Sequence, residues 1–222
     1  MARLSARVWE NNKLTTNTKI AVYNACVLST LLYGSETWTA YARQERRLNT
    51  FHLRCLRRIM GISWQERTPN KDVLERANIQ SMYALLSQRR LRWLGHVRRM
   101  EDGRLPKDLL YSELTTGSRP VGRPRLRYKD VCKRDMRSTD INPDTWEAAA
   151  ADRRNWRYEV RMGVKRAEAK REQQWHDKRE RRRERADSEA PLPTPFTCSN
   201  CDKDCHSRIG LYSHSRRCSS SN

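Results

Sequence analysis

The sequence has no apolar run of the roughly 18 residues that would cross a membrane. Its first residues, MARLSARVWENNKLTT, also lack the apolar core and the cleavage site of a signal peptide. Only 36% of its 222 residues are hydrophobic and 32% are charged, which leaves little material for a large core. We therefore expect an intracellular protein, with no membrane as its partner, built from small helical units.

Acidic residues are scarce relative to basic ones. The chain holds 46 Lys and Arg against 26 Asp and Glu, for a net charge of +20. The positive field of such a chain attracts polyanions, and nucleic acid is the commonest polyanion inside a cell. The charge therefore predicts RNA or DNA as the partner, in preference to an acidic membrane surface, which is the rival polyanion.

Scattered cysteines are few. Only Cys26, Cys55 and Cys132 lie in apolar or helical contexts, whereas the other four of the seven cysteines fall within the stretch FTCSNCDKDCHSRIGLYSHSRRC near the C-terminus. Thiols stay reduced inside cells, so a cluster of this kind favours a metal over disulfides.

Four residues of this stretch follow the pattern C-x2-C-x12-H-x3-C. A two-residue gap lets a tight turn aim both sulfurs at one point, and residues four apart share one face of a helix. Thiolate and imidazole are the ligands that tetrahedral zinc prefers, and four protein ligands leave no open position for a substrate. The pattern predicts one structural Zn²⁺, held by Cys198, Cys201, His214 and Cys218.

The stretch resembles a C2H2 zinc finger. Phe196 lies two residues before the first cysteine and Leu211 three residues before the histidine, where this family places its small core. The resemblance implies a ββα fold for residues 196–218. The sequence departs from the family at two positions, with Cys218 in place of the last histidine and Cys205 where an aromatic core residue is usual.

Alternatives to this metal site stay open. The thiols would be unmetallated if the tail were disordered, and Cys205 or His206 would replace one of the four ligands if the register were different. With the predicted ligands, Cys205 is a small buried filler. A module this short cannot bury enough apolar surface to fold without metal. Zinc would therefore supply most of its folding free energy, on the order of 10 kcal/mol or more.

The finger lacks strong readers of base edges. By resemblance, base contacts would come from Ser207, Gly210 and Ser213, none of which makes a bidentate contact to guanine or adenine. Better candidates for phosphate contacts are three arginines, Arg208, Arg216 and Arg217. We expect weak sequence preference, with a protein-binding finger as the alternative.

Helical periodicity dominates the rest of the chain. It predicts helices over residues 16–33, 43–60, a short segment after Pro69, 81–100, 126–137 and 142–163. Gly34, Gly61 and Gly163 would end three of them, and Asn142 would cap the last. Glycine and proline favour a surface loop between Met100 and Leu126.

The fold class predicted from these patterns is mainly α, with a small helical bundle followed by a charged helical arm and a ββα zinc finger. Residues 1–163 form the basic helical domain and residues 164–187 the arm, which has almost no apolar face and forms only partly without a partner. A proline-containing linker, residues 188–195, separates the arm from the finger at residues 196–218.

Two basic motifs add candidate phosphate contacts. The first, VGRPRLR, carries Arg123 and Arg125 and resembles an AT-hook that enters a narrow minor groove, the alternative being a basic surface loop. The second, KRERRRER, carries Arg181, Arg182 and Arg183 and predicts phosphate contact or a nuclear import signal, the alternative being a solvated arm.

Four segments in order resemble the region after the polymerase core in non-LTR (LINE-type) retrotransposon reverse transcriptases. They are VYNACVLSTLLYGSETW, ERRLNTFHLRCLRRIMGISWQERTPN, LRWLGHVRRMEDGRLPK and DTWEAAAADRRNWR, within residues 13–163. The resemblance implies a polyprotein that nicks target DNA and primes reverse transcription there. This region would then help to hold template RNA or target DNA, and a separate polymerase or another protein would be a further partner.

No aromatic-x-Asp-Asp turn, which supplies metal-binding carboxylates to polymerases of this family, occurs in the sequence. His96 in RWLGH has no partnered nucleophile nearby in the sequence and is expected to be structural. We therefore expect a C-terminal remnant of a polyprotein that binds zinc and nucleic acid, in the nucleus, and is not an enzyme. The alternative is a zinc-finger module that binds protein.

Overall fold

The structure, a computed structural model, describes residues 4–112, 122, 125–188, 196–205 and 207–218. It is mainly helical, as predicted, and no strand occurs in these ranges. The chain divides into two compact units, Met1–Glu172 and Gln173–Asn222, which are described separately below. None of the described helices is both long enough and apolar enough to cross a membrane.

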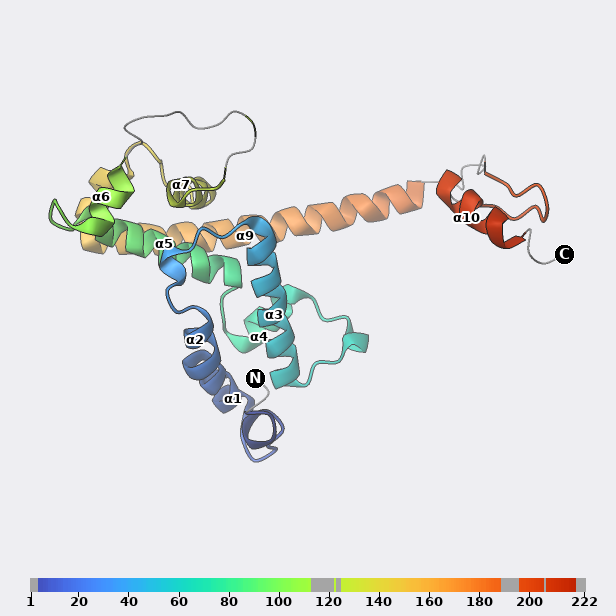
Figure 1. Cartoon of the computed structure of the whole chain (residues 1–222). Coiled ribbons are helices and arrows are strands. Elements are labelled where there is room, and N and C mark those ends of the chain that lie inside the picture. Colours follow the sequence, from blue (N-terminus) through green and yellow to red (C-terminus); the bar gives the residue numbers. More distant parts are fainter. Residues whose placement is uncertain (1–3, 113–121, 123–124, 189–195, 206, 219–222) are drawn as a thin grey trace. The chain divides into compact units, whose positions relative to one another are not determined.

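Figure 1 shows the helices, coloured in chain order. A π-helical turn, Ser5–Trp9, precedes α1 (Thr16–Val22), which continues through a second π-helical segment, Tyr23–Leu28, into α2 (Ser29–Leu31). The remaining helices are α3 (Ala42–Met60), α4 (Asn70–Ala77), α5 (Met82–Arg98), α6 (Leu105–Tyr111), α7 (Tyr128–Ser138), α8 (Trp146–Ala151), α9 (Arg153–Ser188) and α10 (Arg208–Cys218). Two short 3₁₀ turns lie at Ser35–Thr37 and Trp64–Glu66.

Local capping signals explain several helix ends. Gly61 caps the C-terminus of α3 with φ +67°, the left-handed conformation that glycine accepts without a Cβ penalty. Gly34 also adopts φ +67°, but it lies in the turn beyond the cap of α2, which is Leu32. At the start of α5 the Ser81 side chain accepts a hydrogen bond from the backbone N–H of Ala84 (3.3 Å). The ends at Gly61 and Ser81 agree with the predicted positions, whereas α2 ends at Leu31, two residues before the predicted end at residue 33.

The prediction of a surface loop directly after Met100 is wrong for residues 105–111, which form α6. Proline lies in the first turn of this helix, where its missing N–H costs nothing, and Leu110 is buried. The proline, which in the sequence favours a loop, therefore lies at a helix start. Residues 101–104 of that predicted loop form an exposed turn with no helix. Beyond α6, only residues 112, 122 and 125 of the predicted loop belong to the described residues.

The prediction of one helix from Asn142 to Gly163 is also wrong at both ends. Residues 143–145 form a turn, in which the Asn142 side chain accepts a hydrogen bond from the Asp144 backbone, and α8 begins only at Trp146. The helix α9 continues past Gly163 to Ser188. A Cβ at Gly163 would lie 2.5 Å from the backbone oxygen of Thr139, so this glycine permits close packing rather than ending the helix.

Two hydrophobic clusters form the core of the first unit, and α5 contributes to both. The first cluster joins α1, α3 and α4 to the start of α5 through side chains such as Leu56, Val73 and Leu86. The second joins the rest of α5 to α6, α7, α8 and α9, with Leu94 and Trp156 fully buried. The central position of α5 explains why its apolar residues do not lie on a single face.

A buried ion cluster links three helices between these two cores. Arg90 on α5 is only 1% exposed and contacts Glu45 on α3 (2.9 Å) and Asp135 on α7 (2.6 Å). Burial opposes the charge of Arg90, but the two carboxylates outweigh this effect and raise the pKa of its guanidinium. Arg134 adds a second cation 2.7 Å from Glu45. The cluster fixes the register of α3, α5 and α7.

A buried histidine couples the first core to pH. The Nε2–H group of His52 donates to the backbone oxygen of Gln80 (3.2 Å), and its Nδ1 accepts a hydrogen bond from the Tyr23 hydroxyl (2.8 Å). Burial lowers the pKa of His52 below its ordinary value of 6.5. The folded protein thus holds this ring neutral where the unfolded chain would protonate it.

We expect this neutral ring to make folding less stable in acid. The contribution of His52 is complete above about pH 6.5 and is lost as pH falls below that value, at up to about 1.4 kcal/mol per pH unit. Urea unfolding between about pH 7.5 and 5.5 should show this loss, and a His52→Gln variant should show a smaller one. His96→Gln, at an exposed histidine on α5, is the matched control, and an equal pH dependence in both variants would contradict the assignment.

Candidate metal centre

A tight turn brings the first two cysteines of the finger together. The backbone N–H of Cys198 donates to Lys203 (3.0 Å), and that of Cys205 donates to Phe196 (3.0 Å). A single antiparallel bridge pairs Thr197 with Asp204. The expected ββα fold is therefore not supported, because within residues 196–205 the chain makes one bridge around the turn instead of two regular strands.

The helix α10 carries the other two predicted ligands. The Ser207 hydroxyl accepts a hydrogen bond from the backbone N–H of Gly210 (3.0 Å) and caps the start of this helix. His214 and Cys218 are four residues apart in the helix and therefore lie on the same face. The turn and the helix together supply two ligands each.

The four predicted ligands meet at one point. One ligand atom from each of Cys198, Cys201, His214 and Cys218 lies within 4.8 Å of the other three. The Cys201 sulfur and the His214 Nε2 atom are 3.0 Å apart. In a tetrahedral zinc site with Zn–S bonds of about 2.3 Å, two sulfurs lie about 3.8 Å apart, so the observed cluster has the size of a metal site.

The electrostatics of the cluster also suit a cation. A backbone hydrogen bond at Asn200 is the main cause that lowers the pKa of the Cys198 thiol. The nearby Cys201 thiol, followed by burial, raises the pKa of Cys218 to about 11. Three thiolates this close repel one another, so full deprotonation requires a positive charge between them. A divalent metal supplies that charge, and the Cys₃His set can bind a metal ion.

Of the two alternative metal ligands, Cys205 and His206, the structure describes only Cys205. Cys205 is buried and does not belong to the cluster, since its sulfur faces the backbone oxygen of Lys203 at 3.8 Å. It occupies the position of a small buried filler. His206 lies outside the described residues. Phe196 and Leu211, expected to form the small core, are both half-buried.

The predicted phosphate-binding arginines belong to several segments of the chain. Arg208 and Arg216 are exposed on α10, and the guanidinium of Arg216 lies 5.2 Å from the centre of the Tyr212 ring. The position of Arg123 and the side chain of Arg217 lie outside what the structure describes. The remaining predicted arginines are also exposed. They are Arg125, and Arg181, Arg182 and Arg183 on α9.

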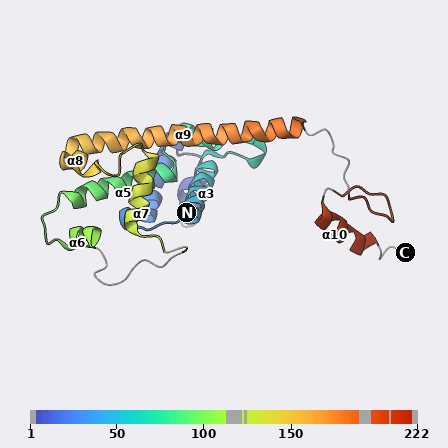
Figure 2. The same cartoon turned by 90° about the horizontal axis from the view of Figure 1, so that it is seen from above.

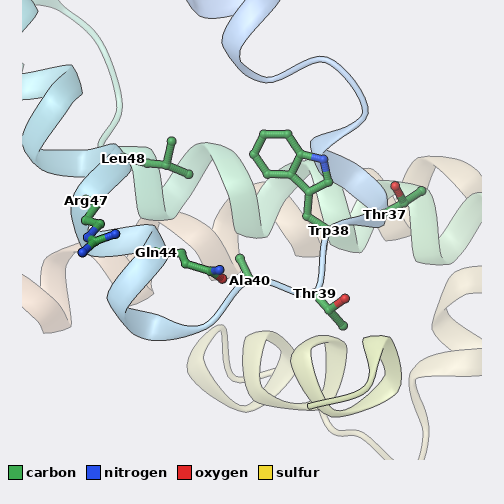
Figure 3. Close-up of a pocket in the computed structure, with 7 residues that line it drawn as sticks. All are labelled: Thr37, Trp38, Thr39, Ala40, Gln44, Arg47 and Leu48. Carbon is green, nitrogen blue, oxygen red and sulfur yellow. The ribbon is translucent and has the colours of Figure 1, made fainter. Parts of the chain in front are cut away.

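One open pocket of about 590 Å³ lies in the first unit, between the segment after Gly34 and α3 (Figure 3). Its lining consists of Thr37, Trp38, Thr39, Ala40, Gln44, Arg47 and Leu48. The lining holds no carboxylate, histidine or cysteine, so it offers no acid–base pair. His96, which the sequence predicts to be structural rather than catalytic, is exposed on α5 with its ring 5.3 Å from that of Trp93.

A row of arginines on α5 and α9 was not predicted from the sequence. The sequence signal for this row is the four-residue spacing of Arg153, Arg157 and Arg161. That spacing alone predicts one helical stripe and does not indicate which other helix lies beside it.

The chain is similar to a transposon-derived protein of Caenorhabditis elegans, with 29% identity over 159 residues. The similarity covers 66% of this chain and 55% of the worm protein, so the chain spans about half the length of that relative. It supports a transposon origin. No family profile and no solved structure matches the chain.

Proposed function

We propose that the chain binds zinc and nucleic acid and derives from the polyprotein of a non-LTR retrotransposon. The observation that carries the proposal is the convergence of Cys198, Cys201, His214 and Cys218 on one point in a chain with a net charge of +20. The similarity to a transposon-derived protein supports the origin. The role is binding rather than catalysis, and the site of action is the nucleus.

The metal in this proposal is one structural Zn²⁺. Thiolate and imidazole donors favour zinc over magnesium or calcium, which prefer oxygen ligands. When bound, zinc would supply a charge that holds three thiolates together and would fold the finger. The chain's own part is to present two ligands on a turn and two on a helix.

Binding to nucleic acid would depend on phosphates rather than on base edges. Arginine forms bidentate hydrogen bonds with phosphate, and α10 carries exposed arginines at Arg208 and Arg216. The residues aligned with base readers, Ser207, Gly210 and Ser213, are too short for bidentate base contacts. We therefore expect similar affinity for unrelated sequences of the same strand type.

Fluorescence polarisation of the zinc-loaded chain against single-stranded RNA, single-stranded DNA and duplex DNA at low salt tests this function. The proposal predicts saturable binding to at least one of these polymers, with less than about a tenfold difference between two unrelated sequences of that polymer. No binding to any of them would overturn it and would favour a protein-binding module.

A further inference from the structure

The helix α5 and the first part of α9 lie side by side in the first unit (Figures 1 and 2). The indole N–H of Trp156 on α9 donates to the backbone oxygen of Leu91 on α5 (2.9 Å). A Cβ at Gly95 would lie 2.1 Å from this indole nitrogen, so only glycine allows the two helices to approach this closely. The packing fixes which side chains meet along the shared edge.

Five arginines follow this edge, and we call them the α5–α9 arginine row: Arg92 and Arg99 from α5 and its C-terminal cap, and Arg153, Arg157 and Arg161 from α9. Those of α9 are spaced by one turn, about 6 Å, and those of α5 by two turns, about 10 Å. All are exposed except Arg99, which is half-buried. The row is therefore a line of cations on the surface of the first unit.

Like charges crowd along the row. Burial lowers the pKa of Arg92, and Arg157 and Arg161 lower it further. Burial also lowers the pKa of Arg99, with Arg153 and Arg157 as the next causes. The two helices run in opposite directions along the row, so Arg99 lies near the start of α9 and Arg92 further along it.

Acidic residues pair with other arginines of α5, whereas most arginines of this row lack an acidic partner among the described residues. Arg98 contacts Glu147 (3.2 Å) and Arg89 contacts Glu36 (4.0 Å). By contrast, Arg92, Arg153 and Arg157 form no ion pair within the part of the chain that the structure describes, although Asp152 is near Arg99. The repulsion between the cations of the row is a cost that a bound polyanion would remove.

We propose that the α5–α9 arginine row binds the phosphate backbone of nucleic acid. The inference rests on the proposed function and assigns it to a surface outside the finger. A linear set of guanidinium groups suits a linear set of phosphates, and each group can hold a phosphate with two hydrogen bonds. Tyr158, 56% exposed and 5.9 Å from the Arg161 guanidinium, offers a ring on which an unpaired base can stack.

A charge-matched pair of variants tests the row in the zinc-loaded full chain. The row variant carries Arg92→Gln, Arg157→Gln and Arg161→Gln. The control variant carries Arg43→Gln, Arg54→Gln and Arg76→Gln, three exposed positions on α3 and α4. Both lose three positive charges, so a general effect of net charge is the same in the two proteins.

Polarisation with fluorescein-labelled oligo(U) RNA and with duplex DNA is the measurement. We expect the row variant to bind about 10- to 100-fold more weakly than the unmodified chain and to lower the salt slope by about 3, while the control changes affinity less than about threefold. Equal losses in both variants, or no loss in the row variant, would overturn the assignment of the row. Failure of the unmodified chain to bind would overturn the proposed function itself.

Two further measurements test whether the row substitutions disturb folding and whether an anionic lipid surface, rather than nucleic acid, binds the row. Thermal unfolding should show the row variant melting no lower than the unmodified chain, because the substitutions remove like-charge repulsion. A large drop in melting temperature would mean that the row is structural. Phosphatidylserine vesicles should compete poorly with RNA, and strong competition that depends on the row would identify a lipid surface instead.

Discussion

Replacing Cys198 and Cys201 together by serine is expected to unfold residues 196–218 and to abolish zinc binding, while the first unit stays folded. The described part of the finger has one backbone bridge and two half-buried core side chains, so the proposed metal ligation would be its main source of stability. For small zinc modules this contribution is about 10 kcal/mol or more. Metal analysis of the purified full chain and the amide resonances of the finger in NMR spectra measure both effects.

Cys205→Ser is the matched control for this prediction. Cys205 is buried in the same module but its sulfur lies outside the ligand cluster, so the variant should keep one zinc per chain. Loss of zinc from this variant would show that Cys205 is a ligand. Unchanged zinc content in the Cys198→Ser, Cys201→Ser variant would contradict the assigned site.

The second large effect is expected from Arg90→Met in the first unit. The substitution leaves the buried carboxylates of Glu45 and Asp135 with only the half-exposed Arg134 as a partner. Removing one member of a buried ion pair costs about 3 to 5 kcal/mol, because a charge is left in a medium of low polarity. Urea unfolding of the zinc-loaded chain, followed by the helical circular dichroism signal, measures the change.

Two comparisons identify the cause of that loss. Arg92→Met, two residues along the same helix but exposed, should change stability by less than about 0.5 kcal/mol. Adding Glu45→Gln and Asp135→Asn to Arg90→Met removes the unpaired charges and should restore part of the stability. A loss below about 1 kcal/mol in Arg90→Met would show that the cluster does not hold α3, α5 and α7 together.

Local signals predicted much of this structure from the sequence. The glycine stop at Gly61 and the start of α5 after Ser81 depend only on neighbouring residues, and both lie where the sequence predicts them. The ligand spacing of the finger is local in the same sense, since a turn and one helix bring the four side chains together. Such features require no knowledge of distant packing.

Other features depend on contacts between distant segments. Gly163 resembles a helix stop in the sequence, but its lack of a side chain accommodates Thr139 from another part of the chain. The arginine row requires that α5 and α9 be neighbours, which is set by Trp156 and Gly95 across more than sixty residues. The prediction of two strands in the finger followed a family resemblance, whereas the chain here closes its turn with one bridge.

The most direct test of the claim that this chain binds nucleic acid through phosphates is the salt dependence of its affinity. For the zinc-loaded chain, the logarithm of the association constant should fall linearly with the logarithm of salt concentration, with a slope steeper than about −3 for duplex DNA. A slope near zero, or no binding at the lowest salt, would contradict the claim.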